Sequence, residues 1–242
     1  MIGRRIAQAV FIPLVATVSV AVGVLGAPPA FATNLKSSNQ AGWSGSEKSS
    51  GHFTTATAKF KVPAVTCPNS GNFGLIATAG WQSIGGTFGQ AAITDNIFCF
   101  NGTLAQSVTV SENDQEGYGG RYLAVSPGDV VSGTFTYDAD TGDIKVAGKN
   151  NTTAKSVSYS GHTLGETWNQ VAFTVNQTNN ETTIPTFATV TFSSLTIDGT
   201  AVFDAANLTG FNLYDSTLTT LKVKAGAANS THNGFTDTFE HA

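Results

Sequence analysis

The residues whose types and spacing could do chemistry are concentrated in one stretch, residues 80–100, GWQSIGGTFGQAAITDNIFCF. In this stretch Trp81 precedes a Gly-Gly turn, and Gln90, Asp95 and Asn96 follow the turn. Carboxyl groups can transfer protons, and carboxamides can orient a hydrogen-bonded reactant. Polar groups gathered beyond a turn in an apolar strand are typical of a functional site on a β scaffold. The alternative is structural: a strand, a turn and a second strand anchored by a disulfide.

An export signal precedes the domain whose strands must position these residues. Arg4 and Arg5 precede an apolar run over residues 7–26, and the Ala-Phe-Ala sequence at 30–32 is typical of a signal-peptidase site. We therefore expect a signal peptide over 1–32, a short extension over 33–37 and a single domain over 38–242. No later stretch is apolar enough to cross a bilayer, so we expect a secreted, extracellular protein that leaves the membrane after cleavage.

Cysteine and histidine usage narrows the chemistry further. Cys67 and Cys99 are the only cysteines, and in an exported chain they predict one disulfide, with two free thiols as the alternative. The four histidines are scattered without metal-ligand spacing, so we expect no metal.

Charge is sparse in this chain. Charged residues make up 12 % of the sequence, and the formal net charge is −4. The sequence contains no basic stripe and no polybasic cluster, so we expect neither a nucleic-acid partner nor an anionic membrane partner. We expect a monomer.

The hydrophobic pattern is that of a β protein. Alternating β-branched and aromatic residues recur between Gly, Pro, Asn and Asp, and helical periodicity is nearly absent. A helical turn is expected only near 204–209. We predict an all-β, two-sheet antiparallel β-sandwich of the jelly-roll type. Its strands are expected near 53–62, 73–82, 91–100, 104–112, 120–126, 129–137, 142–148, 153–159, 167–175, 186–197, 217–224 and 234–240.

Six motifs in register resemble the secreted glutamic peptidases, the eqolisin family. The matching segments are SNQAGW at 38–43, FTTA at 53–56 with FKVPAVTC at 60–67, WQSIGG at 81–86, YLAVSPGD at 122–129, TWNQV at 167–171 with FATVTF at 187–192, and FTDTF at 235–239. The resemblance implies a concanavalin-like sandwich and an acid-active endopeptidase ancestry. It also implies that no metal or cofactor is needed.

The family mechanism uses a Gln and a Glu that face a water in a groove on one sheet. The carboxylate is the general base toward that water, and the amide orients the water and donates to the oxyanion. Gln90 is the candidate for the Gln here, while an alignment without gaps leads to Asp95 or Asn96. The Glu should stand three positions after Trp168, where this chain has Val171. Valine cannot accept a proton, so proteolytic activity is in doubt.

Three further residues are expected near the substrate groove. Glu112 falls where the family has an acid beside its groove, and Trp81 and Trp168 are candidate contacts for a ligand. Two other functions remain open beside a diverged acid peptidase. One is a non-catalytic module that binds a glycan or an extended polypeptide, and the other is an inert structural surface protein.

Overall fold

The structure is a computed structural model that describes residues 34–48, 52–83, 89–114, 117–163, 167–178 and 184–241. Residues 31–242 form one compact unit. The expected signal peptide over 1–32 lies outside the described residues, so it stays a prediction.

The described chain is nearly all β-strand. Its one helix is α1, Val202–Ala205. The strands are β1 Leu35–Ser37, β2 Gln40–Glu47, β3 Thr55–Lys61, β4 Val65–Thr66, β5 Asn72–Ser83, β6 Gly89–Phe100, β7 Thr103–Asp114, β8 Gly117–Leu123, β9 Val130–Tyr137, β10 Asp143–Asn150, β11 Ser156–His162, β12 Trp168–Gln177, β13 Thr186–Phe187, β14 Thr189–Ile197, β15 Thr200–Ala201, β16 Ala206–Tyr214, β17 Leu221–Lys224 and β18 Phe235–Phe239.

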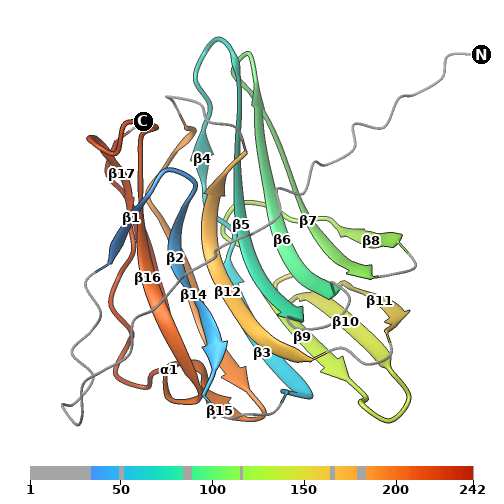
Figure 1. Ribbon diagram of the computed structural model, residues 1–242. Coiled ribbons are helices and arrows are strands. Elements are labelled where there is room, and N and C mark those ends of the chain that lie inside the picture. Colours follow the sequence, from blue (N-terminus) through green and yellow to red (C-terminus); the bar gives the residue numbers. More distant parts are fainter. Residues whose placement is uncertain are drawn as a thin grey trace, which may run out of the picture. The chain divides into compact units, whose positions relative to one another are not determined.

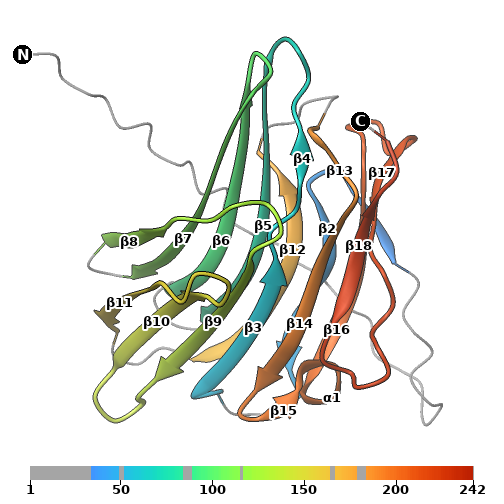
Figure 2. The same cartoon turned by 180° about the vertical axis from the view of Figure 1, so that it is seen from behind.

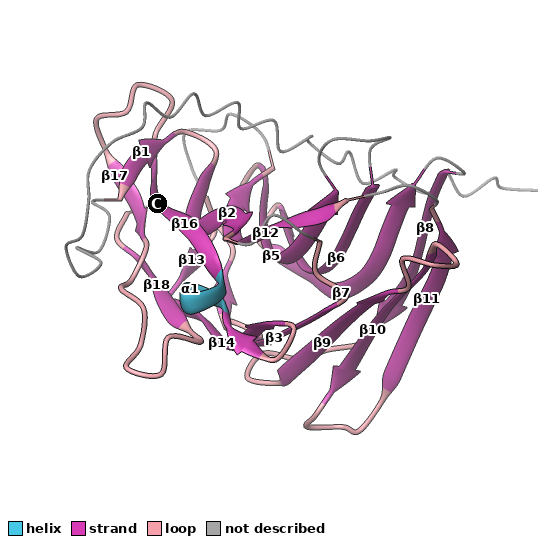
Figure 3. Ribbon diagram, turned by 60° about the horizontal axis from the view of Figure 1, so that its bottom comes forward, coloured by secondary structure: helices cyan, strands magenta, loops and turns pink. Residues whose placement is uncertain are grey.

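Sixteen of the described strands build one continuous sheet that folds into two layers (Figures 1 and 2), and β4 pairs with β13 in a separate two-stranded sheet. One layer has the order β16-β2-β12-β5-β6-β7-β8, and the other has the order β11-β10-β9-β3-β14-β18 (Figure 3). The strand pairs are antiparallel except that β1 runs parallel to β16. The all-β, antiparallel sandwich that the sequence predicts is therefore confirmed.

Strand alternation explains how each layer buries one face. In β3, Ala56, Ala58 and Phe60 are buried, while the residues between them point away from the core. This two-residue period is the pattern by which a strand places its side chains alternately on opposite faces of a sheet.

Aromatic rings hold the two layers together. Trp81 of β5 stacks on Phe135 of β9, with ring centroids 5.7 Å apart, and Trp168 lies 4.7 Å from the same phenylalanine. Glycine allows close approach beside them, because a Cβ on Gly133 would lie 1.7 Å from Ile93 Cδ1. These contacts fix which face of β5, β6 and β12 is internal.

Two expectations need correction at the ends of the chain. The helical turn expected near 204–209 lies earlier, over Val202–Ala205, and Ala206 already begins β16. Strands β1, β2, β4, β15 and β16 were not anticipated. The β2 sequence QAGWSGSE has little strand propensity, and it is held by hydrogen-bonded neighbours on both sides, β12 and β16.

The predicted disulfide is confirmed. Cys67 and Cys99 are bonded, and they tie the segment after β4 to the end of β6.

Candidate functional site

The candidate residues Gln90, Asp95 and Asn96 all lie on strand β6, but they do not point to the same face of the sheet. Asp95 points into the core, where it is 0 % exposed and paired across the strands with Ala77 and Val108. Gln90 and Asn96 lie an odd number of residues from Asp95, so they point to the opposite face of the sheet. Only these two of the three alternatives can face a ligand outside the sandwich.

Gln90 belongs to a row of three glutamines on adjacent strands. Gln170 of β12 is opposite Gln82 of β5, and Gln82 is opposite Gln90 of β6. Adjacent strands lie about 5 Å apart, so the outer two carboxamides are about 10 Å from each other. Gln170 Nε2 donates to Ser46 Oγ on β2 at 3.4 Å.

A row of four threonines crosses the same face further along the strands. Thr174, Thr78, Thr94 and Thr109 are cross-strand partners on β12, β5, β6 and β7. Asn96 is fixed beside them, because its Nδ2 donates to Thr109 Oγ1 at 2.8 Å and to the Ser107 carbonyl at 3.3 Å. The Thr94 hydroxyl is buried and has no hydrogen-bond partner in the described part of the chain.

Small side chains separate the two rows. This middle row consists of Ala172, Gly80, Ala92 and Ser111 on the same four strands. We define the outer face as the glutamine, small-residue and threonine rows together, which are Gln170, Gln82, Gln90, Ala172, Gly80, Ala92, Ser111, Thr174, Thr78, Thr94 and Thr109. None of these residues is ionisable. The three glutamines and Thr78 are half-buried, and the other residues of the face are buried.

A β-bulge decides what β12 contributes to this face. Trp168 pairs with Ser83 and Gln170 pairs with Gln82, so Asn169 is an extra residue on β12. Val171 then pairs with Trp81 and points inward, and the outward residues are Gln170 and Ala172. A valine in the expected Glu position is therefore a core residue, and neither outward neighbour is a carboxylate.

Asp95 is held as a buried acid rather than as a base. Its Oδ2 accepts a hydrogen bond from Gln106 Nε2 at 2.9 Å. Burial raises the pKa of Asp95 to about 7, and the hydrogen bond from Gln106 opposes that rise only in part. At the acid pH that an eqolisin-type reaction needs, this carboxyl group is protonated and shielded from solvent.

Glu112, Trp81 and Trp168 are also inside the sandwich. Glu112 is 1 % exposed and is paired with Ala91, which is itself opposite Trp81. Both indoles are 0 % exposed, and their N–H groups have no partner among the described residues. The structure thus brings Trp81 and Trp168 together around Phe135 but separates all three predicted contacts from Gln90 and the outer face.

The sequence matches the Peptidase A4 family over residues 38–234. This chain belongs to the Peptidase A4 family. The result confirms the resemblance to the eqolisins that the sequence motifs indicate.

Solved structures of the family share the fold. Scytalido-glutamic peptidase with a peptide-based transition-state analogue is 16 % identical, with a TM-score of 0.56. SCP-B, described as an eqolisin in complex with the tripeptide Ala-Ile-His, is 18 % identical, with a TM-score of 0.51. Each match covers 84 % of this chain and 100 % of the other chain. No curated protein sequence matches this chain.

The part of this Peptidase A4 member that the structure describes shows no grouped metal ligands. Within the described residues, no three His, Cys, Asp or Glu side chains are placed to hold a metal ion. No helix in the same part of the chain is long and apolar enough to cross a membrane.

Sequence reasoning missed most of the outer face. Gln82, Gln170 and the four threonines were not singled out, because each is an ordinary polar residue in its own strand. The available signal was the two-residue alternation of residues 73–82, which places Thr78, Gly80 and Gln82 on the face opposite Trp81.

Proposed function

We propose that this protein is an exported, non-proteolytic member of the Peptidase A4 family that binds an extended polypeptide on the outer face. The observation that carries the proposal is the composition of that face. Its residues from β12, β5, β6 and β7 include amides and hydroxyls but no carboxylate. The predicted signal peptide supports export.

The proposed loss of proteolysis rests on the missing base, because the described residues of the outer face include no carboxylate. General base catalysis by a positioned side chain contributes about 10²–10⁴-fold in rate. Val171 points into the core, and the outward residues beside it are Gln170 and Ala172. Asp95 cannot substitute, because its carboxyl group is buried and its pKa is raised to about 7 by that burial.

Polypeptide binding is supported by the chemistry of the same residues. Carboxamide and hydroxyl groups both donate and accept, as the N–H and C=O groups of an extended peptide require. The middle row between the glutamine and threonine rows carries only small side chains. Structures of two relatives hold a peptide-based analogue and the tripeptide Ala-Ile-His, and we extend that ligand class to this chain.

A digestion assay tests the loss of activity. The full chain is expressed with its leader, and the exported product is incubated with denatured casein at about pH 2–5 in the presence of pepstatin. We expect no more peptide release than in a protein-free blank. Acid cleavage that Gln90→Ala abolishes would overturn the proposal and establish a working glutamine at this position.

A binding assay tests the second part of the proposal, which is that the outer face binds an extended polypeptide. Fluorescence anisotropy with a labelled library of unstructured peptides is compared for the wild type, Thr78→Val and a control, Thr136→Val, on the other layer. We expect weaker binding only for Thr78→Val, because Thr78 is the threonine of its row that is not buried and Thr136 lies on the opposite outside surface. If a protein that remains folded binds no peptide, the structural alternative is favoured. Retention on neutral glycans instead would favour the glycan-binding alternative.

A further inference from the structure

Four of the nine lysines of the chain gather on one outside surface of the second layer. They are Lys59 and Lys61 of β3 and Lys145 and Lys149 of β10. Serines and threonines occupy nearly all the positions between and beside them. We define the hydroxyl–lysine face as these lysines together with Thr55, Thr57, Ser132, Thr134, Thr136, Ala147, Ser156, Ser158 and Ser160.

Strand register places these side chains on a common surface. Lys59 is opposite Ser132, Ser132 is opposite Lys149, and Lys149 is opposite Ser156. The intervening residues of each strand, such as Phe60 and Val131, are buried in the core. The face is thus the solvent side of four adjacent strands.

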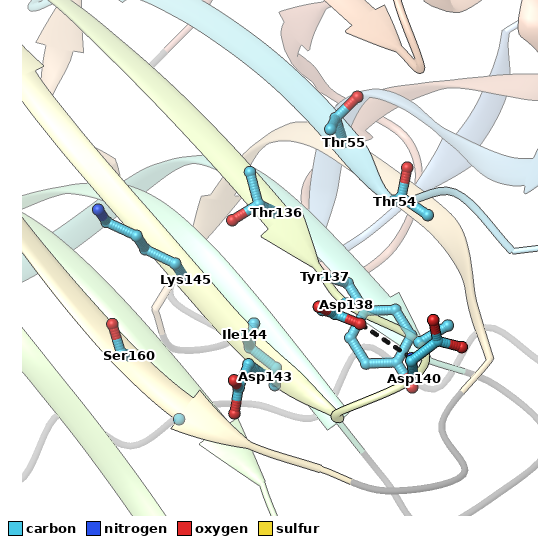
Figure 4. Close-up of a pocket in the computed structure, with 12 residues that line it drawn as sticks. Thr54, Thr55, Thr136, Tyr137, Asp138, Asp140, Asp143, Ile144, Lys145 and Ser160 are labelled. Atoms are coloured by element: carbon cyan, nitrogen blue, oxygen red, sulfur yellow. Dashed lines mark hydrogen bonds between the residues drawn. The ribbon is translucent and has the colours of Figure 1, made fainter.

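A second row of the face is visible at its hairpin end. Thr55, Thr136, Lys145 and Ser160 follow one another across β3, β9, β10 and β11 (Figure 4). They line an open hollow of about 820 Å³ next to the turn between β9 and β10. Hydroxyl groups and an ammonium group therefore converge on one shallow site.

The charge of this face opposes that of the whole chain. The protein has a formal net charge of −4, yet the four lysines form no ion pair within the described residues. Three acids, Asp138, Asp140 and Asp143, lie at the hairpin end and line the same hollow. Asp143 is 3.1 Å from His162, and Asp138 accepts from the backbone N–H groups of Asp140 and Thr141.

We propose that the hydroxyl–lysine face binds an acidic polysaccharide whose sugars carry uronic carboxylates. Lysine ammonium groups pair with carboxylates, and serine and threonine hydroxyls exchange hydrogen bonds with sugar hydroxyls. Lys59 and Lys149 are two strands apart, about 10 Å, so they meet charges that repeat along a polymer. This site is independent of the outer face and of peptide binding.

Two other polyanions fit less well. Single-stranded nucleic acid is bound through aromatic stacking and arginine contacts, and the face contains neither aromatic residues nor arginine. An anionic membrane requires apolar residues that insert, and the apolar residues on this side of the four strands are only Ala147 and the half-buried Val130.

The test compares two triple variants of the full chain that change the net charge equally. The face variant is Lys59→Gln, Lys145→Gln and Lys149→Gln. The control variant is Lys36→Gln, Lys155→Gln and Lys224→Gln, which lie outside the face. Binding to polygalacturonate at about pH 6, where carboxylates are ionised and lysines are charged, is measured by biolayer interferometry. A neutral galactan and single-stranded DNA are the comparison polymers.

We expect polygalacturonate binding that the neutral polymer does not show. The face variant should weaken it at least about tenfold, and the control variant should change it less than about twofold. Thr134→Val with Thr136→Val should weaken it at unchanged charge. Equal loss in both triple variants, equal binding to DNA, or no binding by the wild type would overturn the proposal.

Discussion

The two sides of the sheet at strand β6 differ in the chemical groups that their side chains carry. The inner side carries the acids Asp95 and, across from Ala91, Glu112, both buried among aromatic and aliphatic residues. The outer side carries Gln90, Asn96 and the threonine row, which are neutral. In this Peptidase A4 member, acids and amides that are neighbours in the sequence are thus kept apart by the thickness of the sheet. A dyad requires both groups on one face, and strand alternation prevents that here.

The largest expected effect tests whether the inner side is structural. Trp168→Ala should lower the free energy of unfolding by about 3–5 kcal/mol, because it removes a fully buried indole that contacts Phe135 and Tyr137. The matched outer-face variant Gln82→Ala should cost less than about 1 kcal/mol. Urea denaturation of both variants measures the difference. A stable Trp168→Ala protein that loses ligand binding would contradict the separation of the two sides.

A smaller effect concerns the pH dependence of stability. The pKa of Asp95 is raised by burial from an ordinary 3.8 to about 7. The folded state therefore holds this proton more tightly than the unfolded state does. The associated stability is fully present below about pH 4 and is lost as the pH rises to about 7. Relative to Asp95→Asn, the wild type should lose up to about 4 kcal/mol over that range, measured by urea unfolding at several pH values.

Two other aspartates serve as references for that experiment. Burial also raises the pKa of Asp237, but this group is present in both proteins and cancels in the difference. Asp129 should act with the opposite sign, because hydrogen bonds from the Ser126 backbone N–H and from Asn150 lower its pKa. The stability that Asp129 contributes to the folded state is present above the pKa of this group in the unfolded chain, and it is lost as the pH falls. A flat difference between the wild type and Asp95→Asn would show that Asp95 is solvated.

The smallest expected effect is on peptide binding, which we compare for one substitution on the outer side and one on the inner side. Gln90→Ala should weaken peptide binding about fivefold, which corresponds to about 1 kcal/mol for one hydrogen bond. Glu112→Gln should change the Kd less than about twofold, because Glu112 is 1 % exposed on the inner side. Fluorescence anisotropy on the folded variants measures both. A stronger effect of Glu112→Gln than of Gln90→Ala would place the ligand on the inner side.

The fold was predictable from local patterns. Alternation in segments such as 55–61 and 130–137 predicted strands, and turn residues predicted their ends. Strand β2 was missed because its two flanking strands, β12 and β16, stabilise it, and its own Gly- and Ser-rich sequence does not. The candidate site was predictable only in part. Gln90 was identified, but its glutamine neighbours on β5 and β12 depend on pairing between distant segments.

The sequence by itself determined the β class, the disulfide between Cys67 and Cys99 and membership of the Peptidase A4 family. It did so because alternation, cysteine number and motif order are properties of the linear chain. The tertiary structure decided the register. Pairing with Trp81 points Val171 inward, the extra residue Asn169 lets Trp168 point inward as well, and the parity of β6 separates Asp95 from Gln90. It also gathered Lys59, Lys61, Lys145 and Lys149, which form no basic run in the sequence, because hydrogen-bonded strands bring residues about 90 positions apart to within about 10 Å.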